Sequence, residues 1–121
     1  MTPAAFRRLA LSLDGAVEQQ HMNHPDFRVN GKIFATLAYP DKNWGMVKLT
    51  LEEQKRFVAA APAVFAPVPG GWGLKGATRV NLAAATEKAL RPALESAWMA
   101  ASLAGLKPSA RTKKSKRLKK S

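Results

Sequence analysis

The fold of this chain is decided by the run Phe27-Arg28-Val29-Asn30-Gly31-Lys32-Ile33-Phe34-Ala35-Thr36-Leu37. Strand-forming residues flank Asn30-Gly31, and this dipeptide is a strong hairpin signal because both of its residues tolerate positive φ. A two-residue turn would pair Val29 with Lys32 and Phe27 with Phe34. Residues 32–37 are apolar on both sides of the expected strand, which predicts that this strand lies inside the sheet.

The segments on either side of this hairpin complete an α+β domain. Before it, Thr2-Pro3 begins a helix that Asp14-Gly15 ends, residues 16–22 are extended, and residues 23–26 form a turn. After it, we expect a turn at 39–43, a strand at 44–49, a helix from the capping box Thr50–Glu53 to Pro62, extended segments at 64–68 and 75–82, and a helix from Thr86 to about Leu103. Pro92 would kink that helix or mark a later start. This order predicts a single domain with a mainly antiparallel sheet packed against helices.

Composition narrows the class of protein. The chain has 121 residues, 46% of them apolar, which suffices for one core but not for two ordinary domains. It has no cysteine, so disulfides and thiolate chemistry are excluded. No stretch approaches the ~20 apolar residues of a membrane span, and residues 1–8 lack the pattern of a secretory signal. We therefore expect a cytoplasmic protein without membrane attachment.

The basic charge is concentrated at one end of the chain. There are 20 basic and 8 acidic residues, a net charge of +12, and eight of the basic residues lie in 107–121, where there is no acid. The sequence thus divides into a folded body, 1–106, and a cationic tail, 107–121, which we expect to be disordered. Such a tail neutralises nucleic-acid phosphates without reading sequence, or it only keeps the protein soluble. Its candidate phosphate contacts are Lys113, Lys114, Lys116, Arg117, Lys119 and Lys120.

Two motifs of the body resemble those of the MmcQ/YjbR family. Residues 27–36 are similar to the family's F-R-V-x-G-K-I-F-A block, and residues 70–80 to its G-G-W-G-x-x-G-x-T-x-V segment. Residues 9–15 and the last helix around Ala97-Trp98 fit as well, so the likeness covers roughly residues 5–105. The resemblance implies a small α+β domain of the kind compared with bacterial frataxin (the CyaY-like fold), and DNA binding through two β-hairpin wings.

The resemblance and the charge together favour a non-catalytic DNA-binding protein, with other nucleic acids left open. Candidate contacts on the body are basic residues of the strands and of the segment after Gly-Gly-Trp-Gly: Arg28, Lys32, Lys48, Lys75 and Arg79. Paired strands can enter a major groove and place such side chains along phosphates. Each contact has an ordinary alternative, since exposed lysines often contact nothing specific and Arg28 could form an internal pair on a sheet face.

Trp72 leads to the alternative function. Its neighbouring glycines either expose the indole for stacking on a base or a planar ligand, or turn the backbone so that the indole enters the core. We expect the core position for Trp72, and for Trp44 and Trp98 as well. A pocket lined by Trp72 and apolar strand residues, with no basic face nearby, would instead favour an adaptor that binds a small molecule or a protein partner in a pocket near Trp72.

Two catalytic or nucleotide motifs lack their required context. Gly71, Gly73 and Gly76 match G-x-G-x-x-G, but β-prone residues follow where a dinucleotide site needs a helix. Neither Ser12 nor Ser96 lies in a nucleophile-like turn. We expect neither an enzyme nor a bound cofactor.

The sequence does not favour a metal site. Glu18, His21, His24 and Asp26 lie close enough in sequence to be drawn as ligands, but they straddle an expected strand end. The frataxin comparison suggests iron, yet only 8 acidic residues are spread over the chain. We expect the two histidines to be polar residues at a strand edge, with no metal.

Overall fold

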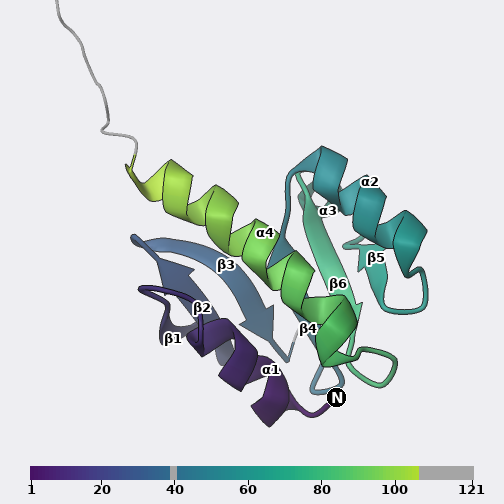
Figure 1. Cartoon of the computed structure of the whole chain (residues 1–121), viewed down its shortest axis with the longest axis horizontal. Helices are drawn as coiled ribbons and strands as arrows, with labels where there is room; N and C mark the ends of the chain where they lie inside the picture. Colours follow the sequence, from purple (N-terminus) through teal and green to yellow (C-terminus); the bar gives the residue numbers. More distant parts are fainter. Residues whose placement is uncertain (39–40, 107–121) are drawn as a thin grey trace, which may run out of the picture.

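The computed structural model of the chain describes residues 1–38 and 41–106. In chain order its elements are α1 (Pro3–Leu11), β1 (Val17–His21), β2 (His24–Val29), β3 (Lys32–Leu37), β4 (Trp44–Lys48), α2 (Leu51–Ala60), β5 (Phe65–Pro67), α3 (Gly71–Leu74), β6 (Ala77–Asn81) and α4 (Glu87–Leu106). The strands form one antiparallel sheet in the order β1-β2-β3-β4-β6-β5 (Figure 1). The predicted α+β class with a mainly antiparallel sheet is confirmed.

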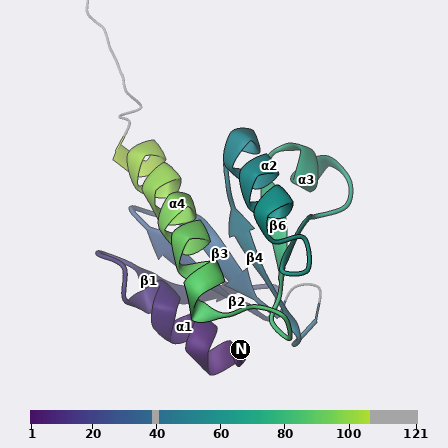
Figure 2. The same ribbon diagram turned by 45° about the vertical axis from the view of Figure 1, so that its right-hand side comes forward.

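Three helices cover one face of the sheet and leave the other open. Figures 1 and 2 show α1, α2 and α4 on the same side, with α4 running across β3. The core between these helices and the sheet is built on side chains less than 2% exposed: Phe6, Phe27, Phe34, Val47, Phe65, Val80, Leu90 and Leu94. No described helix crosses the opposite face, which we call the open face.

Several local signals produce the structure that they predict. Thr2 caps α1 and Thr50 caps α2, because each hydroxyl accepts a hydrogen bond from the backbone N–H three residues on, at 3.1 and 3.2 Å. Asn30 and Gly31 both adopt positive φ, 51° and 79°, so a two-residue turn joins β2 to β3. β3 lies between β2 and β4, as its two apolar sides predicted, and β5 with its proline is at the edge.

The predicted register of this hairpin is wrong beyond its turn. Val29 pairs with Lys32 as expected, but Phe27 pairs with Ala35 instead of Phe34. β3 carries one extra residue at this point, a β-bulge. The bulge places two consecutive side chains of β3, Phe34 and Ala35, in the core.

The turn expected at 23–26 is also wrong. The actual turn is Met22-Asn23, with φ of 48° and 67°, and residues from His24 onward belong to β2. Methionine at positive φ is uncommon, so the sequence carried no signal for a turn at this position. The histidine and proline of 24–25 were typical of a loop, but Pro25 lies beyond the point where β2 pairs with β3.

The C-terminal half differs from expectation at residues 70–75, whereas the predicted start of the last helix near Thr86 is confirmed. Residues 70–75 do not simply lead into a strand, because Gly71–Leu74 form the short helix α3 and β6 begins at Ala77. Pro92 lies inside α4, which begins at Glu87 after the hydroxyl of Thr86 caps it through a hydrogen bond of 3.2 Å.

Candidate functional site

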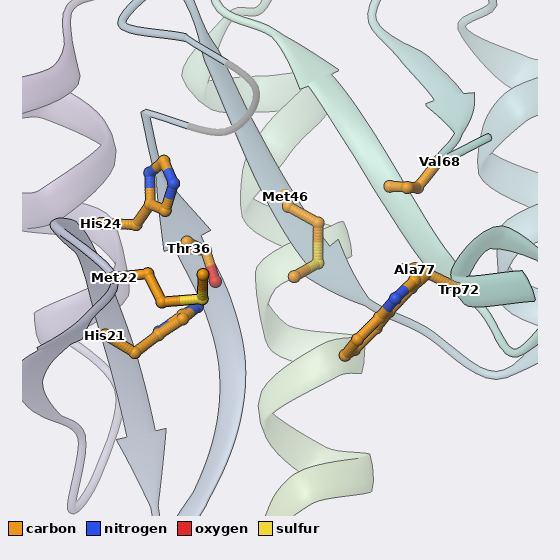
Figure 3. A pocket seen from close by; sticks show the side chains of 8 residues that line it. All are labelled: His21, Met22, His24, Thr36, Met46, Val68, Trp72 and Ala77. Carbon is orange, nitrogen blue, oxygen red and sulfur yellow. The ribbon is translucent and has the colours of Figure 1, made fainter. Parts of the chain in front are cut away.

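A pocket of about 310 Å³ lies on the open face of the sheet (Figure 3). Its floor comes from the central strands, with Thr36 on β3, Met46 on β4 and Ala77 on β6. One wall is the β1–β2 hairpin, and the other is α3 with the segment before it. The walls are formed by His21, Met22, His24, Val68 and Trp72.

Trp72 is 63% exposed, so the prediction that its indole enters the core is wrong. The buried residue of this motif is its neighbour Gly73, where a Cβ would lie 1.8 Å from the carbonyl oxygen of Val68. The Gly73 carbonyl accepts a hydrogen bond of 3.0 Å from Gln54 on α2. Because α3 packs through its glycine, Trp72 stands out at the mouth of the pocket. Trp44 and Trp98, also expected in the core, are half-buried.

The floor of the pocket contains a hydroxyl that has no hydrogen-bond partner among the described residues. Thr36 is 0% exposed, and its Oγ1 makes no hydrogen bond to any described residue. Figure 3 shows this oxygen among the side chains that line the pocket. A buried hydroxyl left unpaired costs about 1–3 kcal/mol, so such groups usually face a water or a ligand.

A buried carboxylate holds the hairpin wall in place. Asp26 accepts hydrogen bonds from Arg28 Nε at 2.8 Å and Nη2 at 3.1 Å, and its Oδ2 lies 2.7 Å from His21 Nδ1. The hydrogen bond from Arg28 lowers the pKa of the Asp26 carboxyl, burial opposes this, and the hydrogen bond from His21 lowers it further. An ionised carboxylate only accepts, so His21 Nδ1 carries the proton and Nε2 remains for other contacts.

The candidate phosphate contacts fall into two groups. Arg28 is paired with Asp26 inside the protein, which is the alternative to a phosphate contact that the sequence left open, so its charge is compensated. Arg79 is half-buried on the open face, with its guanidinium 5.0 Å from the ring of Trp44 and its Nε without a hydrogen-bond partner in the described part. Neither arginine projects freely, whereas Lys32, Lys48 and Lys75 are all exposed.

These three lysines meet at one end of the sheet, which we call the lysine end. Lys32 and Lys48 line a hollow beneath the last turns of α4, and Lys48 lines a second hollow with Lys75 and Trp72. The amide of Asn30 donates a hydrogen bond of 3.1 Å to the carbonyl of Ser102, which holds the β2–β3 turn against the end of α4. The tail candidates Lys113, Lys114, Lys116, Arg117, Lys119 and Lys120 follow α4 in sequence but lie outside the described residues.

The alternative function placed a pocket near Trp72, and the structure has one there, but the sequence did not predict that the β1–β2 hairpin forms its opposite wall. His21 and Trp72 lie about fifty positions apart in the sequence, and only the strand order β1-β2-β3-β4-β6 places them across one floor. No group of three or more His, Asp or Glu side chains within 1–38 and 41–106 is placed to hold a metal ion. No helix in the same ranges is long and apolar enough to cross a membrane.

Comparisons with known proteins confirm the family resemblance. The family model named YjbR matches residues 11–100. A crystal structure of the Deinococcus radiodurans protein DR2400, whose domain is named DUF419, is similar with a TM-score of 0.72 at 16% sequence identity. The match covers 89% of this chain and 83% of that chain, and at this identity it shows the fold alone. No curated protein matches the chain significantly.

Proposed function

We propose that this chain, which belongs to the YjbR family, is a nucleic-acid-binding protein of the cytoplasm that contacts phosphates through the lysine end. The observation that carries the proposal is the meeting of Lys32, Lys48 and Lys75 at the end of the sheet where α4 finishes. In the sequence, eight further basic residues follow directly. Binding would be set by charge, with DNA as the expected partner and no catalytic step.

The register of the sheet supports this arrangement. Lys32 begins β3, Lys48 ends β4, and Ala77 opposite Lys48 begins β6 two positions after Lys75. Because the three strands alternate in direction, these positions fall at the same end. All three ammonium groups are on exposed side chains, as phosphate contacts require.

The acidic side chains near this end lie in the first turn of α2 and on α4, and Glu53 is the paired one among them. Glu53 in the first turn of α2 is bonded to Arg56 and to the hydroxyl of Ser96. Glu52 beside it and Glu95, which lines a hollow with Glu53, are exposed. The lysine end therefore keeps a positive balance even without the residues that follow Leu106.

The proposal is tested by a salt titration of binding to a fluorescein-labelled DNA duplex. We compare the wild-type chain with the variant Lys32→Gln/Lys48→Gln/Lys75→Gln between about 50 and 200 mM salt. The slope of log K against log salt falls by about 0.9 for each phosphate contact removed, so this variant should lose about 2–3 units of slope and bind roughly tenfold or more weakly. A chain ending at Leu106 should also bind more weakly with a flatter slope.

The matched control removes the same charge elsewhere. Lys42, Lys55 and Lys88 are exposed and line none of the hollows around the lysine end. Their triple glutamine variant should keep the wild-type slope. Equal losses in both triple variants would show that only total charge matters, and a wild-type chain that ignores DNA at low salt would overturn the proposed function.

A further inference from the structure

We propose that the open-face pocket receives one unpaired nucleobase, stacked on Trp72, while the phosphate of the same nucleotide lies on Lys48 and Lys75. The inference rests on the proposed function and names the form of nucleic acid that the chain prefers. Its ligand chemistry is a planar base with an attached phosphate. A single strand and a free nucleotide both supply that chemistry.

Trp72 lines two hollows of different character. One is the pocket, with the apolar side chains of Met22, Met46 and Val68 around its floor. The other is the hollow that Lys48 and Lys75 line, and it shares Trp72 and the floor residue Ala77 with the pocket. A ligand at Trp72 thus meets apolar walls at one end and two ammonium groups at the other.

The size of the pocket fits one planar ring system. A volume of about 310 Å³ is at the lower limit for ligand sites in proteins, which span roughly 300–1,000 Å³. Trp72 is 63% exposed and Met22 is 86% exposed, and Figure 3 shows them on opposite sides of the space. A flat ligand between Trp72 and Met22 would contact both side chains and would explain why both are exposed across one cavity.

Polar groups in the pocket suit the edge of a base. The hydroxyl of Thr36 is buried and free of any hydrogen bond to the described residues, and it can both donate and accept. His21 is oriented by Asp26 through Nδ1, which leaves Nε2 for a second contact. Every nucleobase carries donors or acceptors on its edge, so these groups would hold a base without strong selection among bases.

The same geometry excludes a base within a duplex. A paired base has its edge bonded to its partner and both of its faces stacked on neighbours, so it cannot enter a pocket without unpairing. A base of a single strand has no pairing partner, so its edge and its faces are available to the pocket. We therefore expect preference for single strands, with the lysine end contributing to both forms through phosphates.

The test compares a single strand of about 20 nucleotides, longer than the ~4–16 nucleotides that single-strand binding folds cover, with its duplex. Full-length wild-type chain and the variants Trp72→Ala, Trp72→Phe and Thr36→Val are titrated in parallel. Trp72→Ala should weaken single-strand binding by roughly 5- to 150-fold, the value of one base–aromatic stack, and leave duplex binding unchanged. The affinity of Trp72→Phe for the single strand should lie between those of wild type and Trp72→Ala. Thr36→Val should weaken single-strand binding roughly 2- to 10-fold.

Leu74→Ala is the matched control, because Leu74 is 76% exposed on the same short helix and does not line the pocket. If Trp72→Ala and Leu74→Ala behave alike, or if Trp72→Ala weakens the single strand and the duplex equally, the base pocket is overturned while the proposed function stands. If the wild-type chain binds neither form, the proposed function fails. In that case AMP is added and tryptophan fluorescence is measured. Quenching that is lost in Trp72→Ala would identify a free nucleotide as the ligand of the pocket, and the absence of quenching would overturn the pocket too.

Discussion

Thr36 and Thr78 are two threonines that the fold buries completely, one on each face of the sheet. On the helix-covered face, the Thr78 hydroxyl donates to the carbonyl of Gly76 at 2.9 Å and accepts from Gln54 at 3.1 Å. On the open face, the Thr36 hydroxyl has no bond to any described residue. The chain thus completes the hydrogen bonds of the buried Thr78 by itself, whereas the buried hydroxyl of Thr36 is open to a bond from outside the described residues.

The two faces are connected through one side chain. The amide nitrogen of Gln54, buried on α2, lies 3.0 Å from the carbonyls of Gly73 and Ala77 as well as 3.1 Å from Thr78. This set of bonds fixes the short helix α3, and α3 presents Trp72 to the open face. Hydrogen bonds on the covered face therefore hold the helix that places Trp72 on the open face.

The largest effect is expected where this connection is broken, in Gly73→Ala. The new Cβ would lie 1.8 Å from the Val68 carbonyl oxygen, so α3 must shift and the bonds of Gln54 must weaken. We expect the free energy of unfolding to fall by about 3 kcal/mol or more, as for severe overpacking of a core. Urea unfolding measures this value.

Gly71→Ala is the control for that variant. A Cβ at Gly71 meets nothing within 4 Å, so stability should stay the same or rise by up to about 1 kcal/mol from helix propensity. If Gly73→Ala is as stable as Gly71→Ala, α3 is not held by its glycine, and the explanation for the exposure of Trp72 is wrong.

The next largest effect is expected in Asp26→Asn, which removes the buried charge of the open face. The variant should lose about 2 kcal/mol at neutral pH, because the charge-assisted bonds from Arg28 and His21 are weakened. The folded pKa of Asp26 is lowered, so its stabilisation is complete above the unfolded pKa of about 4 and is lost as the pH falls through the lower folded value.

Urea unfolding of both proteins across the acidic range checks the sign. The difference in stability between wild type and Asp26→Asn should be constant near neutral pH and shrink in acid below about pH 4. A difference that grows on acidification would contradict the assignment of Asp26 as an ionised partner of Arg28.

Much of the covered face could be predicted from the sequence, because its signals are local. Threonine caps, the Asn30-Gly31 turn and the apolar pattern of residues 32–37 each act within a few positions, and all are confirmed. The inward face of α2 does not follow its apolar residues: Leu51 is exposed, and the polar Gln54 takes a buried position. Its partners lie on β6 and α3, about twenty residues away, so its own segment gave no sign of them.

The open face depends on contacts that no local pattern encodes. Trp72 is flanked by glycines on both sides, and only the close approach of Gly73 to Val68 decides which residue is buried. Met22 lies in a turn with positive φ that methionine seldom adopts. The lysine end arises from the pairing of three strands, which the sequence of any one strand does not specify.

The smallest change in the free energy of unfolding is expected for the pair Thr78→Val and Thr36→Val, which compares the two buried hydroxyls directly. Valine keeps the shape of threonine and removes the hydroxyl. At Thr78 the change removes one hydrogen bond from the Gln54 amide, which keeps the carbonyls of Gly73 and Ala77, and one from the Gly76 carbonyl, which keeps the N–H of Leu49. Stability should fall by about 1–2 kcal/mol for the two lost bonds. At Thr36 the change breaks no hydrogen bond to a described residue, and it removes a buried polar group that has no such bond. Stability in the absence of ligand should therefore stay the same or rise. Thermal and urea unfolding of the two variants measure the difference directly, and equal losses would mean that the open face is as complete as the covered one and needs no ligand.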